Sequence, residues 1–264
     1  EVAGVVVLVE DVSVAHNAHQ RERELLQEQH RIEMMRVESL RKLALSVAHQ
    51  IRNPVASIGG FASLALRRRP GDERMEGYLA TIIDEAKRLE EVVKAVHEYA
   101  TLPAPRPAPT PLAELVRAAR RLLEARAGEL HRSFVWRETL AGASPAVDPA
   151  LMTEALGALL INALEFSEGP RPEIRVEARM ADDILAVSVI DQGQGIAPAD
   201  MPFVFDPFFT TKTHGVGLGL TKARRIVEEH GGWLGLKSEP GRGTTVTVSL
   251  PLSDPAARAP APEA

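Results

Sequence analysis

The sequence predicts the α+β class: an antiparallel helical hairpin that dimerises into a four-helix bundle, joined to an α/β sandwich domain. Three observations support this prediction. The stretch from about residue 19 to 68 contains no glycine before Gly59 and reads as one long helix. Prolines then alternate with other residues over 103–111, where a helix cannot continue. Beyond them, residues 112–252 mix helical and strand patterns.

The composition excludes several classes of protein. The net charge is −5 over 264 residues, which argues against nucleic-acid binding because such proteins usually carry a basic patch. The chain has no cysteine, which excludes disulfides and zinc-thiolate sites. No apolar run approaches the roughly 18 residues that cross a bilayer. We therefore expect a cytoplasmic chain that would meet a membrane only through parts outside it.

Two helices joined by a turn form the predicted hairpin. The turn is Arg69–Asp72, which contains a Pro-Gly pair, and the second helix runs from about Glu73 to Ala100. Its apolar residues recur in steps of four and three, the spacing of a bundle seam: Met75, Leu79, Ile82, Ala86, Leu89, Val93 and Val96. Because two helices alone bury little surface, the seam predicts a homodimer.

The domain boundaries follow from changes in composition. Residues 1–13 are predicted to be the end of a truncated domain, because they contain a single strand that cannot be stable alone. A coiled coil and the hairpin span 14–102, and the proline linker spans 103–111. The second domain occupies 112–252, and the Pro/Ala-rich tail 253–264 is predicted to be disordered.

The second domain is predicted to place helices on a largely antiparallel sheet. Its helices fall near 112–128, 149–166 and 217–230. Its strands fall near 133–138, 173–179, 184–190, 233–238 and 244–250.

His49 lies on the first helix of the hairpin, away from its apolar stripe. The stripe consists of Leu43, Val47, Ile51, Val55, Ile58, Phe61 and Ala65. At the helical rotation per residue, His49 lies about 180° from this stripe, with Asn53 one turn further along. An outward histidine is usually only solvated, but here Pro54 interrupts the helical hydrogen bonds and small neighbours leave room for another molecule.

Two segments of the second domain suit a nucleotide base and a metal ion. Asn162 lies on the helix 149–166 and offers a carbonyl oxygen suited to Mg²⁺, although a helical asparagine is more often structural. Asp191 ends a buried strand, where its carboxylate can accept a hydrogen bond from the amine of adenine. Gly193 and Gly195 follow, and their lack of side chains would let the backbone approach a ligand. An ordinary strand-to-loop turn is the alternative.

Two further segments suit phosphates. Four of the seven phenylalanines lie within 203–209 and are followed by Thr210, Thr211 and Lys212. They read as the apolar anchor of a mobile lid over 206–216 with a phosphate-binding lysine, or else as a satellite core. The segment Gly215–Leu220 opens a helix, whose N-terminal N–H groups favour an anion. It matches neither a Walker A loop nor a Rossmann turn.

These segments together resemble a known family. Residues 45–54, Leu-Ser-Val-Ala-His-Gln-Ile-Arg-Asn-Pro, resemble the H-box of sensor histidine kinases. The four segments of the second domain, in this order and spacing, resemble the N, G1, F and G2 boxes of the ATP-binding domain of that family. The resemblance covers about residues 40–250. The strand that ends at 9–13 also resembles the end of a PAS sensor domain running into a coiled coil.

The resemblance implies a set of functional residues. His49 would be the phosphorylated residue, with Gln50 and Asn53 beside it in catalysis, and neutral imidazole is a suitable nucleophile at pH 7. Asn162 would bind Mg²⁺. The ATP site would comprise Asn162, Asp191, Gly193, Gly195, Ile196, Phe203, Thr211, Lys212, Gly215, Gly217, Leu218 and Gly219.

Two positions depart from the family pattern. Gln50 stands where the family usually has an acid directly after the histidine, and a glutamine cannot accept a proton. This predicts slow autophosphorylation and leaves a phosphatase role, with water positioned by Asn53, relatively favoured. Ala158 stands where the family often has another asparagine and where gyrase-like ATPases have a glutamate that activates water. That alanine argues against hydrolysis.

The resulting hypothesis is a kinase that autophosphorylates His49 from ATP and passes the phosphoryl group to an aspartate on the receiver domain of a response regulator. Transfer within a protomer and transfer across the dimer both remain open. Two rivals remain as well: a gyrase- or MutL-type ATPase, and a scaffold or phosphatase whose ATP site only senses nucleotide. The first predicts phosphate release without His49, and the second predicts nucleotide binding without phosphohistidine.

Overall fold

The computed structural model describes residues 47–48, 50–65, 67, 74–212 and 215–252. The predictions for the first strand, the preceding coiled coil, the turn at 69–72, the tail and His49 itself lie outside these residues. Within the described ranges, no helix combines the length and the apolar character needed to span a bilayer.

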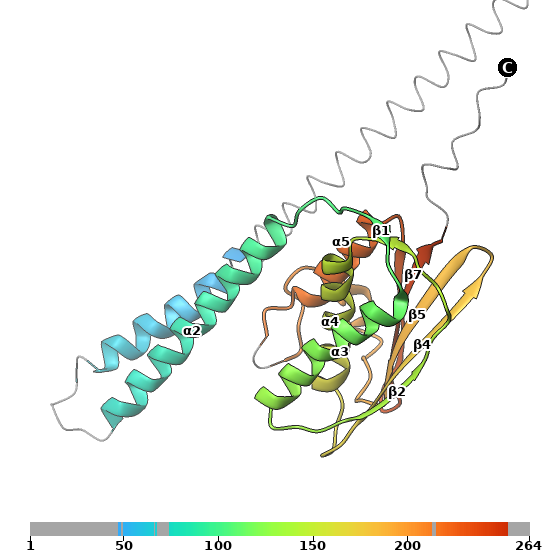
Figure 1. The fold of residues 1–264 in the computed structure, drawn as a ribbon. Coiled ribbons are helices and arrows are strands. Elements are labelled where there is room, and N and C mark those ends of the chain that lie inside the picture. The colour runs from blue at the N-terminus through green and yellow to red at the C-terminus, as the bar shows by residue number, and fades with distance from the viewer. Residues whose placement is uncertain (1–46, 49, 66, 68–73, 213–214, 253–264) are drawn as a thin grey trace, which may run out of the picture. The chain divides into compact units, whose positions relative to one another are not determined.

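The predicted helical hairpin is confirmed. Residues 50–65 are helical, and α2 (Arg74–Ala100) forms the second helix beside them (Figure 1). The ring of Phe61, late in the first helix, lies 5.8 Å from the ring of Tyr78, early in α2. The helix continues on both sides of Pro54, which is buried, so the proline does not end it.

The predicted seam of α2 divides into two sets of residues. Met75, Ile82, Leu89 and Val96, one per heptad, are half-buried. Leu79, Ala86 and Val93 are exposed, with Leu79 at 49% and Val93 at 55% of their full surface. The exposed set is an apolar strip that the first helix of the hairpin does not cover.

The second domain is a layer of helices on a mixed sheet (Figure 1). The helices on the sheet are α3 (Leu112–Glu129), α4 (Pro149–Glu165) and α5 (Gly219–Glu229). The five-stranded sheet has the order β2 (Val135–Thr139), β4 (Glu173–Ala181), β5 (Ile184–Asp191), β7 (Gly243–Pro251) and β6 (Trp233–Glu239). Only the β2–β4 pair of this sheet is parallel, so the predicted helix-on-sheet fold is confirmed.

The end of the proline linker belongs to the second domain. Ala108–Pro109 form a short strand, β1, which pairs antiparallel with β3 (Ala146–Val147). Thr110 is buried, and its backbone N–H donates to the carbonyl of Pro145 at 3.0 Å. The last residues of the proline linker predicted over 103–111 are therefore extended and paired with a segment of the second domain.

The helix α4 is the central element of the domain. Most of its residues are apolar and buried, because α3 lies on one side of it, α5 on the other and the sheet beneath it (Figure 1). Asp148 caps its N-terminus by accepting from the N–H groups of Ala150 and Leu151. A helix packed on so many sides is a rigid support for the polar residues near its C-terminal end, Asn162 and Glu165.

Candidate nucleotide-binding site

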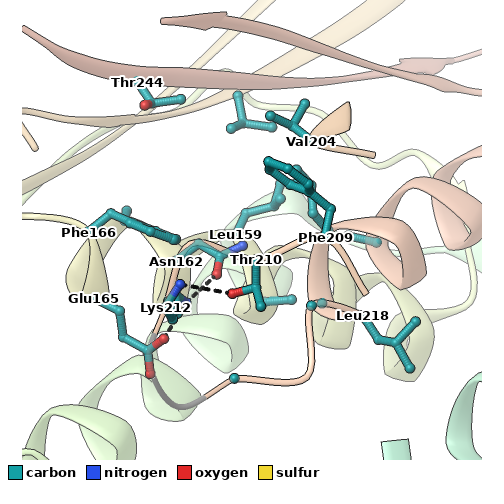
Figure 2. Close-up of a pocket in the computed structure, with 18 of the residues that line it drawn as sticks. Leu159, Asn162, Glu165, Phe166, Val204, Phe209, Thr210, Lys212, Leu218 and Thr244 are labelled. Atoms are coloured by element: carbon teal, nitrogen blue, oxygen red, sulfur yellow. Dashed lines mark hydrogen bonds and ion pairs between the residues drawn. The ribbon is translucent and has the colours of Figure 1, made fainter. Parts of the chain in front are cut away.

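A cavity of about 830 Å³ opens beside the C-terminal half of α4. Its walls also come from the end of β5, the loop that follows it, the segments 204–212 and 215–218, and the start of α5 (Figure 2). Apolar side chains, including Leu159, Val204 and Phe209, line much of it, and a few polar groups converge on it. Its size and lining are those of a site for a small molecule such as a nucleotide.

Asp191 provides a buried hydrogen-bond acceptor at one end of the cavity. It ends β5 and is 8% exposed. Its Oδ1 accepts from the backbone N–H groups of Gly193 at 2.8 Å and Thr244 at 3.1 Å. Burial raises the pKa of this carboxyl, and the two N–H donors oppose that rise. Within the described part of the chain, both of these hydrogen bonds reach Oδ1, so Oδ2 can accept from a donor on a ligand.

The glycines after Asp191 let other parts of the backbone approach closely. A Cβ on Gly193 would overlap the carbonyl oxygen of Phe166, and Gly193 does not line the cavity. Gly195 has a φ of +69°, and a Cβ there would overlap the carbonyl of Glu239. Gly195 and Ile196 do line the cavity. The N–H of Gly193 holds the carboxylate of Asp191 in place, and the approach of Gly193 to a ligand stays a prediction.

The phenylalanine cluster fixes the base of the predicted lid. Phe208 is buried, and its backbone N–H donates to the carbonyl of Gly217 at 3.0 Å. Gly217 has a φ of +73° and packs against the backbone of Phe208 and Phe209. Phe203 is 48% exposed, lies against the ring of Phe209, and does not line the cavity. Contact of Phe203 with ATP stays a prediction.

The start of α5 offers N–H groups to an anion. The helix begins at Gly219, and the N-cap residue Leu218 makes no side-chain hydrogen bond to it. The space around the α-carbon of Gly219 is open, and Gly215, Gly217, Leu218 and Gly219 all line the cavity. This arrangement can hold phosphate oxygens.

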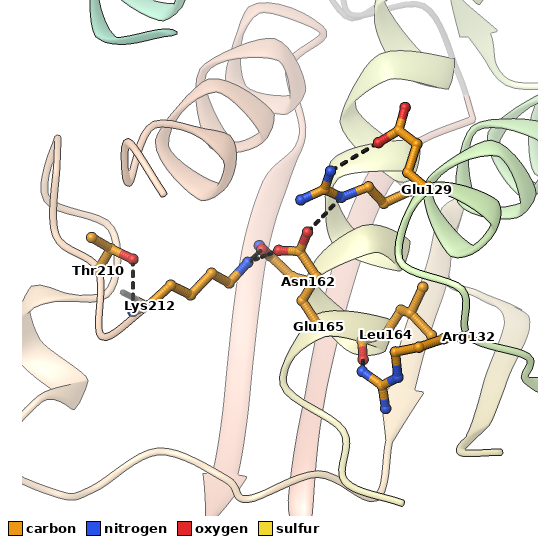
Figure 3. Close-up of polar contacts among 8 residues, drawn as sticks. Glu129, Arg132, Asn162, Leu164, Glu165, Thr210 and Lys212 are labelled. Carbon is orange, nitrogen blue, oxygen red and sulfur yellow. Dashed lines mark hydrogen bonds and ion pairs between the residues drawn. The ribbon is translucent and has the colours of Figure 1, made fainter. Parts of the chain in front are cut away.

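Lys212 brings a positive charge into the cavity, where it contacts two residues of α4. Its Nζ donates to Oδ1 of Asn162 at 2.9 Å and to Oε2 of Glu165 (Figures 2 and 3). The ammonium also lies 4.4 Å from the ring centroid of Phe166. The lysine predicted to meet phosphates and the asparagine predicted to hold Mg²⁺ are thus in direct contact.

Glu165 joins this lysine to a second cation. Its Oε1 accepts from Nε of Arg126 at 2.7 Å, and Arg126 also donates to Glu129 at 2.8 Å (Figure 3). Burial alone would raise the pKa of Glu165, but hydrogen bonds and charge from Lys212 and Arg126 outweigh it and lower the pKa. Glu165 is therefore an ionised carboxylate held between two cations.

Sequence reasoning placed most, but not all, of the cavity residues. Asn162, Asp191, Gly195, Ile196, Thr211, Lys212, Gly215, Gly217, Leu218 and Gly219 line the cavity. Glu165, Phe166 and Thr244 line it too and were not predicted. Gln50 is helical and half-buried, and Asn53 is helical and exposed, as expected.

Two family models match the chain. Residues 39–105 match the His Kinase A (phospho-acceptor) domain, and residues 147–254 match the histidine kinase-, DNA gyrase B- and HSP90-like ATPase. The sensor histidine kinase ZraS of Salmonella typhimurium is 35% identical over 242 residues, which are 90% of this chain and 51% of that protein. The chain spans about half the length of the curated relatives it matches first.

Solved structures share the same architecture. The crystal structure of histidine kinase ThkA in complex with response regulator protein TrrA has a TM-score of 0.65 and 27% identity, covering 83% of this chain and 64% of that one. The structure of full-length ShkA in complex with AMPPNP has a TM-score of 0.55 and 26% identity, covering 81% of this chain and 46% of that one.

Proposed function

The chain belongs to the sensor histidine kinases of two-component systems, and from this premise we propose that it autophosphorylates His49 from ATP and passes the phosphoryl group to a response regulator. One observation carries the proposal. A single chain contains the phospho-acceptor sequence around His49 and a cavity with a buried carboxylate at one end and a lysine with an open helix start at the other. These groups suit the binding of a nucleoside triphosphate.

Different residues of the cavity suit different parts of the nucleotide. We assign the amine of adenine to Oδ2 of Asp191, because its other oxygen already accepts two N–H groups. The apolar walls formed by Leu159, Val204 and Phe209 suit the faces of the base. We assign the phosphates to Lys212 and to the N–H groups at the start of α5. The structure of ShkA in complex with AMPPNP supports a nucleotide as the ligand of this kind of domain.

Asn162 is the residue suited to Mg²⁺. Its Oδ1 is a hard carbonyl oxygen on a rigid helix, which fits a cation that also takes phosphate and water oxygens. Within the described ranges, no cluster of three histidine or acidic side chains is placed to hold a metal ion. Bound Mg²⁺ would neutralise phosphate charge as the phosphoryl group leaves.

The proposed transfer is an in-line displacement at the γ-phosphorus. The unprotonated nitrogen of the neutral His49 imidazole attacks, the bond from phosphorus to the bridging oxygen breaks, and ADP leaves with the electron pair. The other ring nitrogen releases its proton to a base or to water, which gives neutral phosphohistidine. The phosphohistidine then gives its phosphoryl group to an aspartate carboxylate of a receiver domain. The complex of ThkA with TrrA supports a response regulator as this partner. Because ATP and such regulators are cytoplasmic, the proposal places this chain in the cytoplasm.

We also propose that a second copy of the chain completes the hairpin. Leu79, Ala86 and Val93 form an exposed apolar strip on α2, at the spacing of a helical-bundle seam. Such a strip is unfavourable in water and fits the equivalent strip of an identical chain. The homodimer would be the four-helix bundle that the sequence predicts.

Hydrolysis of ATP by water is disfavoured as the main reaction. Ala158 lines the cavity one turn before Asn162, where an ATPase needs a group that activates water. An alanine methyl group cannot do this. The cavity therefore favours transfer of the phosphoryl group to another nucleophile.

Incubation with γ-labelled ATP tests the proposal. We expect label on the chain that survives alkali and is lost in acid, as phosphohistidine is, and no label on a His49→Ala variant. Adding a response regulator should move the label to that protein. Phosphate release that persists undiminished in His49→Ala would support an ATPase, and nucleotide binding without labelling would support a sensor of nucleotide.

A further inference from the structure

The ammonium of Lys212 already contacts three groups of the chain itself. It donates to Asn162 at 2.9 Å and to Glu165 (Figure 3). It also lies 4.4 Å from the ring centroid of Phe166. Its backbone is held as well, because the N–H of Lys212 donates to Oγ1 of Thr210 at 3.1 Å. A phosphate that is to bind this lysine must therefore replace contacts that already exist.

The contact with Asn162 involves the same atom that suits Mg²⁺. A magnesium ion sits about 2.1 Å from its oxygen ligands. A lysine ammonium at 2.9 Å from the same Oδ1 would then lie close to a divalent cation, and the two like charges repel. Binding of Mg²⁺ at Asn162 thus requires the ammonium to move away from that oxygen.

Glu165 is the group that keeps the ammonium there. Its side chain is 15% exposed and that of Lys212 is 20% exposed, so the pair is shielded from water more than a surface ion pair. Arg126 binds the other carboxylate oxygen and fixes the direction of the side chain. Glu165 lies one helical turn after Asn162 on α4, which sets both acceptors on one face toward Lys212.

We propose that Glu165 is a positioning residue that holds the ammonium of Lys212 on Asn162, so that a nucleotide and its Mg²⁺ must compete with an ion pair inside the chain. This inference rests on the proposed function. Glu165 would lower the affinity for nucleotide indirectly, by holding Lys212, and not by touching the nucleotide itself. A chain with a weaker ion pair should bind nucleotide more tightly.

Calorimetric titration with AMPPNP and Mg²⁺ measures this effect. We expect Glu165→Gln to tighten binding about tenfold, because the charge-assisted hydrogen bond to Lys212 is lost while the amide oxygen can still accept from Arg126. Glu129→Gln is the matched control: it removes the same charge from a partner of Arg126 that does not contact Lys212. We expect that variant to bind as the parent does.

A double-mutant cycle separates this mechanism from simple repulsion between Glu165 and the phosphates. If Glu165 acts through Lys212, then Glu165→Gln should change affinity less than twofold once Lys212→Gln is present. Full tightening in the Lys212→Gln background would overturn the proposal, as would no tightening in the single variant. In thermal melts without nucleotide, the two substitutions should be non-additive, and additive effects would also contradict it.

The same titration distinguishes failure of this inference from failure of the proposed function. If the parent chain binds no AMPPNP, the kinase assignment fails. If the parent binds AMPPNP and the cycle shows no coupling, only the role given to Glu165 fails, and the melts without nucleotide report on the ion pair in either case.

Discussion

Asp191 illustrates, at the scale of one residue, a conflict between stability and binding. Its carboxylate lies at the end of a buried strand, and burial raises its pKa. The folded chain therefore holds the proton more tightly than the unfolded chain, so the ionised group lowers stability as the pH rises through that pKa. Recognition of an amine needs a buried acceptor that faces a cavity. The fold remains stable despite the unfavourable burial of this carboxylate.

Asp191→Asn should therefore stabilise the fold and impair the site. The amide oxygen can still accept from Gly193 and Thr244, while the amide NH2 replaces the acceptor for adenine. We expect a higher melting temperature at neutral pH and a loss of ATP affinity of roughly tenfold to a hundredfold. The gain in melting temperature should disappear when the pH falls far enough to protonate Asp191.

Inosine triphosphate provides the control for Asp191, because it lacks the amine that adenine carries. The parent should prefer ATP, and Asp191→Asn should lose that preference. A variant that binds ATP as tightly as the parent, or that keeps its preference, would remove Asp191 from the adenine site.

The residues that sequence reasoning missed are those whose role depends on distant contacts. Asp191 and the start of α5 could be predicted, because a strand end and a glycine-rich helix start are local patterns. Glu165 could not, since its contact with Lys212 joins positions 47 apart in the chain. Thr244 could not be predicted either, because it acts through its backbone N–H, which almost every residue type has. Gly193 could be predicted as a constrained glycine, but its close approach to the backbone of Phe166 could not, because the two residues lie far apart in the chain.

At the scale of elements, the N-terminus of α4 connects the linker to α5. Asp148 caps α4 and accepts from the N–H of Arg106 at 3.0 Å through Oδ2. The N–H of Asp148 donates to Nε2 of the buried His230, whose Nδ1 contacts the carbonyl of Ile226 at 2.7 Å. One capping residue therefore joins the linker, α4 and the end of α5.

Asp148→Ala should destabilise the fold by about 1 kcal/mol at neutral pH through loss of the helix cap. Burial would raise the pKa of Asp148, but backbone N–H donors, Arg106 first among them, lower it. For a carboxyl with a lowered pKa, the stabilisation is present above the ordinary value of about 4 and is lost as the pH falls through the folded value. Urea unfolding of both proteins measures the difference, which should shrink in acid.

Asp148→Asn is the matched control for the cap, since asparagine caps helices nearly as well as aspartate. Its effect at neutral pH should be smaller than that of Asp148→Ala. Equal losses in the two variants would show that the charge of Asp148, rather than the cap, stabilises the fold.

The main elements could be predicted because their patterns are periodic. The predicted helices of the second domain match α3, α4 and α5 within two residues at each end, and the predicted strands overlap β2, β4, β5, β6 and β7. The pair β1–β3 could not be predicted, because two-residue strands have no period and prolines favour a linker. Pairing with a distant segment decides that local structure.

The hairpin strip is testable as an element. Leu79 and Val93 are about half exposed, and we expect Leu79→Glu with Val93→Glu to convert a dimer to a monomer, because the substitutions would bury four charges per dimer. Light scattering after size exclusion measures the mass. Asp84→Ala, at an exposed position more than a quarter turn from the strip, should leave the mass unchanged. A monomeric parent, or a double variant that remains dimeric, would contradict the proposed dimer.

At the scale of the whole molecule, binding and chemistry belong to different parts of the chain. The cavity lies in the second domain, and the phospho-acceptor sequence lies in the hairpin. The motifs of each part predict its role because each is local. Phosphoryl transfer from the cavity to the acceptor histidine depends on a geometry that neither motif encodes. The rate of transfer must therefore be tested with a change in the acceptor region that leaves nucleotide binding constant.

Gln50 is the residue for that last test. It follows His49 on the helix, and its amide cannot take a proton from the attacking imidazole. Gln50→Glu should raise the rate of autophosphorylation by about a hundredfold or more, within the range of general-base catalysis, while the affinity for AMPPNP stays constant because Gln50 does not line the cavity. Gln50→Ala, which removes the amide without adding a base, should not accelerate the reaction. Equal rates in Gln50→Glu and the parent would mean that proton removal does not limit transfer, and the slow step would then lie in bringing the nucleotide to the histidine.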